Sequence, residues 1–89
     1  MRIEYDPDKD QANQAKHGVS LAAAAEMDLD KAIVIEDRRF DYGEARFLAY
    51  APIGGRLHVL YFTMRGTVIR AIGLRKANTR ERKHYERAP

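Results

Sequence analysis

The pattern of polar and apolar residues changes several times along the chain, beginning with a short strand and a polar helix. Residues 2–5 alternate between polar and apolar side chains, and Asp6-Pro7 then offers an N-cap followed by a proline at the first helical position. The predicted helix is polar, with alanine as its repeated apolar residue, so we expect it on the surface. It is expected to end at Lys16 or His17, before Gly18, the usual residue for the left-handed turn past a helix end.

A second helix and a strand are predicted next. Ser20 is a good N-cap for a helix over residues 21–28, LAAAAEMD, whose alanines favour helix and allow close packing. The β-branched run KAIVIE at 31–36 then predicts a strand. Residues 37–44 are polar and contain glycine, which is typical of a loop or of a poorly ordered strand end.

The following segment predicts a three-stranded meander with strands at 46–53, 56–64 and 67–75. Gly54-Gly55 and Arg65-Gly66 are the expected hairpin turns, with glycine adopting positive φ. The preceding strand, KAIVIE, is expected to join this meander as a fourth strand.

Both faces of the central strand of the meander carry apolar residues. Leu57, Val59 and Tyr61 are predicted to point to one face, and the residues between them to the other. The helices of so small a chain can cover one face, so we expect the other to be partly exposed or covered by a partner. His58 is expected to be buried in the core or in an interface, and Tyr61 to serve packing.

A last helix over 79–87 is predicted from Asn78-x-x-Glu81, which resembles a capping box, and Tyr85 is its only large side chain. The expected order of elements is β-α-α-β-β-β-β-α. The fold class is therefore α+β, with a small antiparallel four-stranded sheet plus a short N-terminal strand. Two N-terminal helices and one C-terminal helix are expected to flank this sheet, in a single domain over residues 1–89.

Composition excludes several classes of function. A chain of 89 residues can hold one modest core, and the absence of cysteine removes disulfides, thiolate metal sites and cysteine nucleophiles. The longest apolar run has five residues, against the roughly 20 of a membrane-spanning helix, so we expect a soluble cytoplasmic protein with no membrane contact. The sequence contains no zinc-hydrolase, NTPase or dinucleotide-binding motif, and no metal or cofactor is expected.

Charge is distributed unevenly along the chain. Residues 1–44 carry six basic and eleven acidic groups, whereas residues 65–89 carry eight basic and two acidic groups. The basic C-terminal segment would attract a polyanion and the acidic first half would not. We therefore expect one surface that faces RNA or DNA.

Two places in the sequence are candidates for phosphate chemistry. Arg70 interrupts an apolar strand, so its guanidinium needs an anionic partner, either a phosphate or a carboxylate such as Glu44 or Asp41. Lys16 and His17 stand together at a helix end, where they either complement the helix dipole or offer an acid or base to a phosphate ester. RNA cleavage without a metal needs only such proton-transfer groups and fixed positive charge.

Four segments, in order and spanning essentially the whole chain, are EYDPDKDQANQAKHGV, DYGEAR, YFTMRG and IRAIGLRKANTRERKHYE. With them the chain closely resembles the BrnT-type toxins of bacterial toxin–antitoxin systems. The resemblance implies a fold of the RelE/ParE superfamily and a metal-independent endoribonuclease that arrests translation. It also implies a BrnA-like ribbon-helix-helix antitoxin as partner and RNA as substrate, with operator DNA bound only through the antitoxin complex.

The resemblance and the basic C-terminal segment together suggest which residues lie at the RNA site. The residues expected to act in catalysis are Lys16, His17, Arg65, Arg75 and Tyr85. The residues expected to bind RNA are Arg46, Arg70, Arg80 and Lys83. In this interpretation the two catalytic arginines hold the phosphate, Lys16 or His17 transfers the proton, and Tyr85 stacks or assists.

An alternative remains open at this point, because a fold does not settle the chemistry it carries. The chain could be a non-catalytic module that binds RNA, the ribosome or DNA gyrase and inhibits it without cutting anything.

Overall fold

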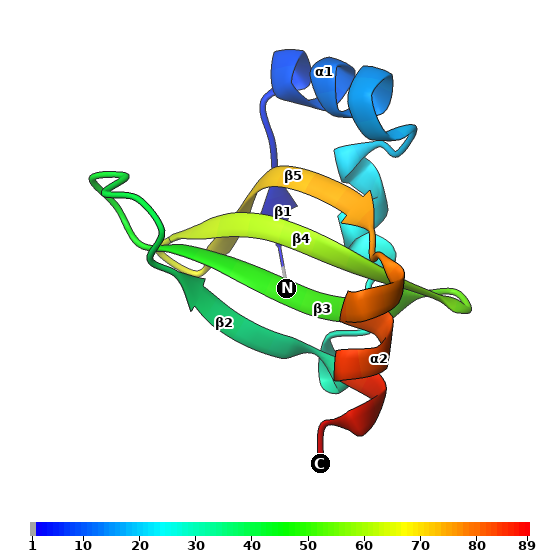
Figure 1. The fold of residues 1–89 in the computed structure, drawn as a ribbon. Helices are drawn as coiled ribbons and strands as arrows, with labels where there is room; N and C mark the ends of the chain where they lie inside the picture. The colour runs from blue at the N-terminus through cyan, green and yellow to red at the C-terminus, as the bar shows by residue number, and fades with distance from the viewer. Residues whose placement is uncertain (1) are drawn as a thin grey trace.

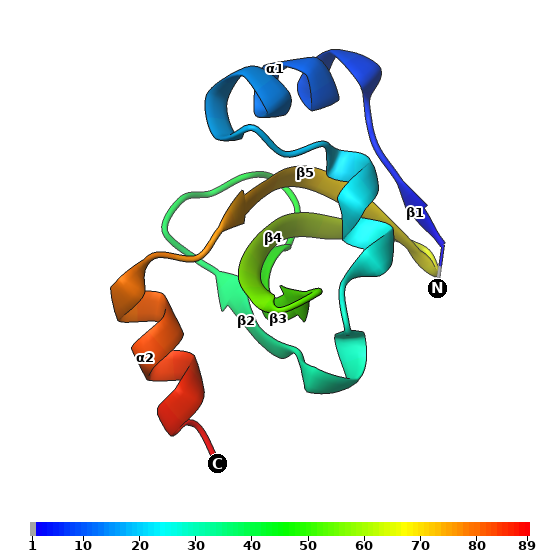
Figure 2. The same cartoon turned by 90° about the vertical axis from the view of Figure 1, so that its right-hand side faces the viewer.

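The computed structural model describes residues 2–89, in which one sheet separates helical segments on its two faces (Figures 1 and 2). The strands lie in the order β1-β5-β4-β3-β2. In this part of the chain no helix is long and apolar enough to cross a membrane. In chain order the elements are β1 (Ile3–Glu4), α1 (Pro7–His17), η1 (Leu21–Glu26), η2 (Leu29–Lys31), β2 (Ile33–Asp37), β3 (Arg46–Ile53), β4 (Arg56–Arg65), β5 (Val68–Lys76) and α2 (Thr79–Arg87).

The predicted α+β class and the antiparallel meander of β2 to β5 are confirmed. The predicted layout of the sheet is wrong at its edge, because β1 pairs with β5 in parallel and makes the sheet five-stranded and mixed. Alternating side chains identify a strand but carry no information about its partner or direction. The second hairpin turn lies at Gly66 and Thr67, one residue later than predicted, because Arg65 still pairs with Val68.

The predicted second helix is a 3₁₀-helix, η1, instead of an α-helix. Ser20 caps it as predicted, accepting a hydrogen bond from the amide of Ala22. The buried side chains are Leu21, Ala24 and Met27, so the buried positions recur every three residues. In a 3₁₀-helix residues three apart lie on the same side, so this segment directs all three towards the sheet.

The sheet has one apolar core on each face. On the face covered by η1, here called the η1 face, the core includes Leu60, Phe62 and Leu74. The opposite face, here called the α2 face, carries Leu57 and Val59; α2 lies beside this face (Figure 2), and its Tyr85 packs against this core. The face was expected to be partly exposed or covered by a partner; the chain's own C-terminal helix covers part of it, and Ile35 on β2 remains 48% exposed.

A β-bulge in β5 determines which of its side chains share a face. Tyr61 pairs with Gly73 but Phe62 pairs with Ala71, which leaves Ile72 as an extra residue. Without the bulge, Arg70 and Arg75 would point to opposite faces, because they are an odd number of residues apart. The bulge places both on the α2 face.

Helix α1 is fixed to the edge of the sheet by the buried side chain of Asn13. Its Nδ2 donates hydrogen bonds to the carbonyl oxygens of Val19 and Leu74, each at 2.8 Å. Its Oδ1 accepts a hydrogen bond from the amide of Leu74 at 3.1 Å. One side chain thus satisfies three backbone groups and holds the C-terminal half of α1 above β5 (Figure 1).

Candidate functional site

Arg75, near the end of β5, is held in a fixed orientation by two side chains. Its Nη1 and Nη2 donate to the two carboxylate oxygens of Glu81 at 2.8 and 2.9 Å. Its Nε and Nη2 donate to the Tyr61 hydroxyl at 3.2 and 3.0 Å. Its Nη1 also donates to the carbonyl oxygen of Lys76 at 3.4 Å, so every N–H of the guanidinium has a partner within the chain, and the side chain is 25% exposed. Planar, forked donors of this kind suit carboxylate and phosphate groups.

The same carboxylate connects this arginine to α2. Glu81 also accepts a hydrogen bond from the amide of Asn78, while the Asn78 side chain accepts one from the amide of Glu81, which confirms the predicted capping box. The Arg75 hydrogen bonds lower the pKa of Glu81, and Glu81 in turn raises the pKa of Arg75. Both groups therefore stay charged at neutral pH.

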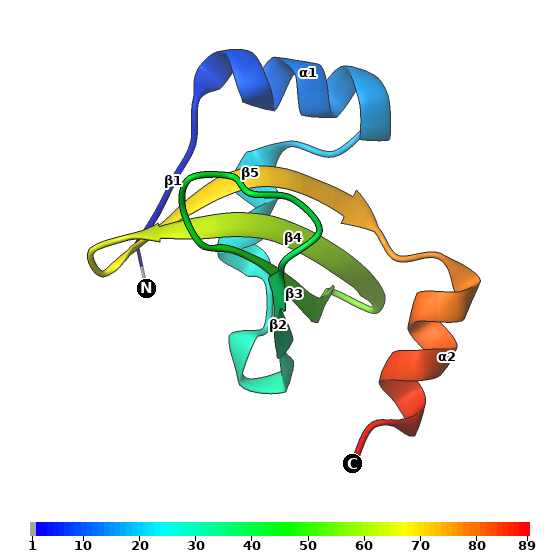
Figure 3. The same cartoon turned by 60° about the vertical axis from the view of Figure 1, so that its left-hand side comes forward.

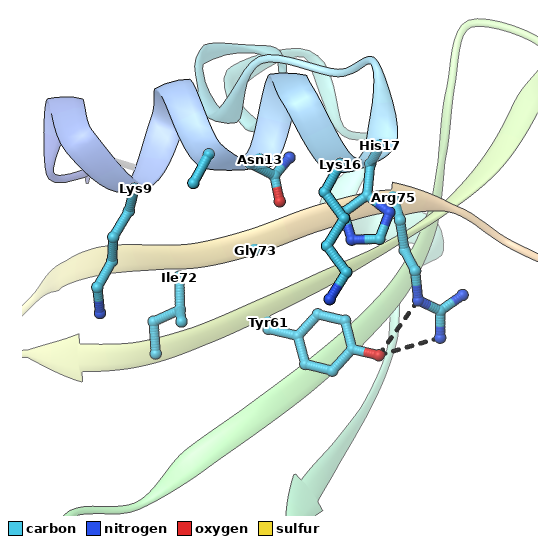
Figure 4. A pocket seen from close by; sticks show the side chains of 9 residues that line it. Lys9, Asn13, Lys16, His17, Tyr61, Ile72, Gly73 and Arg75 are labelled. Carbon is cyan, nitrogen blue, oxygen red and sulfur yellow. Dashed lines mark hydrogen bonds between the residues drawn. The ribbon is translucent and has the colours of Figure 1, made fainter.

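A hollow of about 430 Å³ lies between α1 and the sheet, beside Arg75 (Figure 4). Four of its lining residues can carry positive charge, and none of its lining residues is acidic. Figure 4 shows Lys9, Lys16 and His17 descending from α1, with Tyr61 and Arg75 below them on the sheet. The lining residues are Lys9, Ala12, Asn13, Lys16, His17, Tyr61, Ile72, Gly73 and Arg75.

His17 is suited to accept a proton in this hollow. Partial burial is the main cause that lowers its pKa, and the positive charges of Lys16 and Arg75 lower it further. The imidazole is therefore neutral at pH 7, which is the form that acts as a general base.

A second hollow, of about 290 Å³, lies on the other side of Arg75, towards β2. Tyr61 and Arg75 line both hollows, and the two together are called here the Arg75 groove. Asp37, Arg38 and Arg39, at the end of β2, line its far part. The groove therefore crosses the α2 face from α1 to the edge strand.

Of the nine residues predicted for the RNA site, Lys16, His17 and Arg75 come together in this groove. Arg65 lies at the far end of β4, exposed, with its guanidinium 3.9 Å from Glu44. The structure thus separates the two arginines that were expected to hold one phosphate.

Two of the predicted RNA-binding arginines have internal partners. Arg70 forms an ion pair with Glu4 at 3.6 Å, which corrects the expectation of Glu44 or Asp41 as the carboxylate partner. The parallel pairing of β1 with β5 sets Glu4 directly opposite Arg70. Arg46 places its guanidinium over the ring of Tyr42 at 4.2 Å.

The remaining predicted residues lie on α2, outside the Arg75 groove. The Tyr85 hydroxyl donates to the carbonyl oxygen of Lys31, and its ring packs against the core of the α2 face. This contact holds α2 against the sheet. Arg80 and Lys83 are exposed and line a separate surface hollow of about 380 Å³.

The sequence did not predict that Tyr61 and Glu81 both bind the guanidinium of Arg75. Tyr61 was expected to serve packing only, and its ring does pack beside Val59, but its hydroxyl also binds Arg75. The only signal in the sequence was that a tyrosine, and not an apolar residue, continues the alternation of Leu57 and Val59. For Glu81 the sequence predicted only the capping role. Its contact with Arg75 depends on how α2 packs beside β5, which the sequence pattern does not show.

An arginine, a histidine and a lysine gathered beside a sheet offer the side-chain chemistry that can bind a phosphate ester of a polyanion. A family model described as "Ribonuclease toxin, BrnT, of type II toxin-antitoxin system" matches residues 5–81. The chain belongs to this family of ribonuclease toxins, so RNA is its substrate and an antitoxin its partner. A comparison with curated proteins finds no match.

Proposed function

We propose that the chain is a metal-independent endoribonuclease that cleaves RNA in the Arg75 groove. The observation that carries the proposal is the Arg75 guanidinium, which Tyr61 and Glu81 fix beside the basic hollow below α1. Because the hollow already supplies fixed positive charge and groups that move protons, the reaction has its necessary parts without a metal.

In the proposed reaction the 2′-oxygen of the RNA attacks the adjacent phosphorus. Neutral His17 accepts the 2′-OH proton, and the bond between phosphorus and the 5′-oxygen breaks. Lys16, in its protonated form, donates a proton to the departing 5′-oxygen. Arg75 stabilises the charge on the phosphorane, and the Tyr61 hydroxyl, which accepts from Arg75, is free to donate to a phosphate oxygen. The products are a 2′,3′-cyclic phosphate and a 5′-hydroxyl.

We further infer that the fold is of the RelE/ParE type and that the antitoxin is a BrnA-like ribbon-helix-helix protein. The support for both is the resemblance of four ordered segments to the BrnT-type toxins, together with the antiparallel meander that carries the groove. In this arrangement operator DNA is bound through the antitoxin complex.

Incubation of the purified chain with end-labelled RNA in EDTA tests metal independence directly. We expect cleavage at the same rate with and without EDTA, and fragments that end in a cyclic phosphate. Cleavage that occurs only with added Mg²⁺ would contradict the proposal that the reaction needs no metal. No cleavage under any condition, combined with growth arrest on induction, would instead support the binding module that inhibits the ribosome or gyrase without cutting.

The pH dependence of cleavage tests the role of His17. Because a general base must be neutral, the rate is expected to fall about tenfold for each pH unit below the His17 pKa and to level off above it. Burial, Lys16 and Arg75 lower this pKa, so the midpoint should lie below the ordinary value of 6.5. Single-turnover rates between pH 4.5 and 8 measure it, and His17→Gln should lack this limb. If the rate of His17→Gln fell at low pH in the same way as the wild-type rate, the general base would be another group.

A further inference from the structure

The loop between β2 and β3, residues 38–45, is built around one buried carboxylate. The Asp37 side chain is 4% exposed, and it accepts hydrogen bonds from the Arg39 guanidinium through Nε and Nη2, each at 2.9 Å. It also accepts from the Arg39 amide and from the Tyr42 hydroxyl, at 3.2 and 2.9 Å. The Arg39 hydrogen bonds are the main cause that holds the pKa of Asp37 well below its usual range. The charged Asp37 thus holds Arg39 and Tyr42, which stand on either side of the loop's tip, against the end of β2.

This loop presents an aromatic side chain to solvent. Phe40 is 67% exposed, more than the other large hydrophobic residues in the described part of the chain. The Tyr42 ring meets it edge-on at a centroid distance of 5.8 Å, and the Arg39 guanidinium lies 5.9 Å from its centroid. Arg46 in turn covers the Tyr42 ring, so two arginines flank a pair of aromatic rings in one cluster. In Figure 1 the loop projects beyond the ends of the strands, and in Figure 3, with that side turned forward, it lies in front of the sheet.

The cluster adjoins the Arg75 groove. Asp37, Arg38 and Arg39 line the far part of the groove, together with Tyr61 and Arg75. An RNA strand that crosses the groove at Arg75 would therefore meet the exposed side chains of Arg38 and Arg39, each of which is paired with a carboxylate of β2.

We propose that Phe40, supported by Arg39 and Tyr42, is a stacking platform for an unpaired base of the RNA strand whose scissile phosphate lies at Arg75. This inference rests on the proposed function. An aromatic face flanked by guanidinium groups suits a nucleobase, since stacking is sequence-tolerant and the neighbouring phosphates need positive charge. The exposed ring, its arginine neighbours and its position beside a hollow that Arg75 also lines favour RNA over a protein partner at this position.

Phe40→Trp gives a direct binding readout, because the chain contains no other tryptophan. A single-stranded 2′-O-methyl RNA of eight nucleotides, which cannot be cleaved by attack of a 2′-hydroxyl, is expected to quench the tryptophan emission as it binds. The matched control is Phe47→Trp, on the η1 face of β3, where RNA is not expected to change the emission. Because this arm needs no cleavage, it tests the platform even if the proposed enzymatic function fails.

Cleavage kinetics provide the second arm. Phe40→Ala is expected to raise KM for an eight-nucleotide RNA roughly tenfold while kcat stays within twofold, and Phe40→Tyr should behave like the wild type. A dinucleotide that occupies only the Arg75 hollow should show no change. Equal KM values for Phe40→Ala and the wild type, or tryptophan emission that responds to the antitoxin but not to RNA, would overturn the platform. A wild-type chain that cuts neither substrate would instead count against the proposed function.

Discussion

Replacing Arg75 with alanine is expected to lower the rate of RNA cleavage by about 100- to 1,000-fold, the loss typical of removing one pre-oriented donor to a charged transition state. The reason is that Arg75 is the guanidinium in the groove that two side chains orient, through Glu81 and Tyr61. Single-turnover cleavage of labelled RNA measures the effect, and growth on induction gives the matching result in cells, where toxicity should disappear.

Two control variants separate charge from geometry. Arg75→Lys keeps the charge but not the planar fork, so it should recover only a small part of the lost rate. Arg87→Ala removes one equal charge from the exposed end of α2 and should cleave like the wild type. Circular dichroism of each variant checks the fold. Full activity in a folded Arg75→Ala chain would place the phosphate elsewhere and remove the observation on which the proposed function rests.

The parts of this fold that could be predicted from sequence are those that depend on local interactions. Asp6 and Gly18 set the ends of α1, and the reciprocal hydrogen bonds of Asn78 and Glu81 begin α2, as their positions in the sequence predicted. Each of these signals involves residues within a few positions of one another. His58 was also correctly expected to be buried, since it lies inside an apolar strand.

The features that escaped prediction depend on pairing between distant segments. The bulge at Ile72 follows from how β5 fits against β4, and it decides that Arg70 and Arg75 share a face. The partner of Arg70 is Glu4, which only the parallel pairing of β1 brings opposite. For the same reason the sequence could gather Lys16, His17 and Arg75 as candidates but could not separate Arg65 from them.

Glu81 shows how local and tertiary roles combine in one side chain. Its Oε1 accepts both the amide of Asn78, which begins α2, and Nη1 of Arg75, which lies on β5. The orientation of Arg75 therefore depends on α2 being formed and docked. Tyr85, which was predicted to act on RNA, fixes the same helix through its hydrogen bond to the carbonyl of Lys31.

Asn13→Ala is expected to reduce the free energy of unfolding by about 2 to 4 kcal/mol, because it leaves buried backbone groups of Leu74 and the carbonyl of Val19 without their partner. Equilibrium urea unfolding followed by circular dichroism measures the loss. The control is Gln14→Ala, one position away on the exposed side of α1, which should change stability by less than about 0.5 kcal/mol.

Asn13→Ala should also affect the Arg75 groove. Asn13 fixes the position of α1 on the sheet, and Lys16 and His17 on α1 line the hollow. At a temperature where Asn13→Ala is still folded, we expect slower cleavage together with the lost stability, whereas Gln14→Ala should keep both. If Asn13→Ala were as stable as the wild type, the hydrogen bonds to β5 would not be what fixes α1. If it were less stable but cleaved RNA at the full rate, the position of α1 would not matter to the reaction, and Lys16 and His17 would lose their proposed roles.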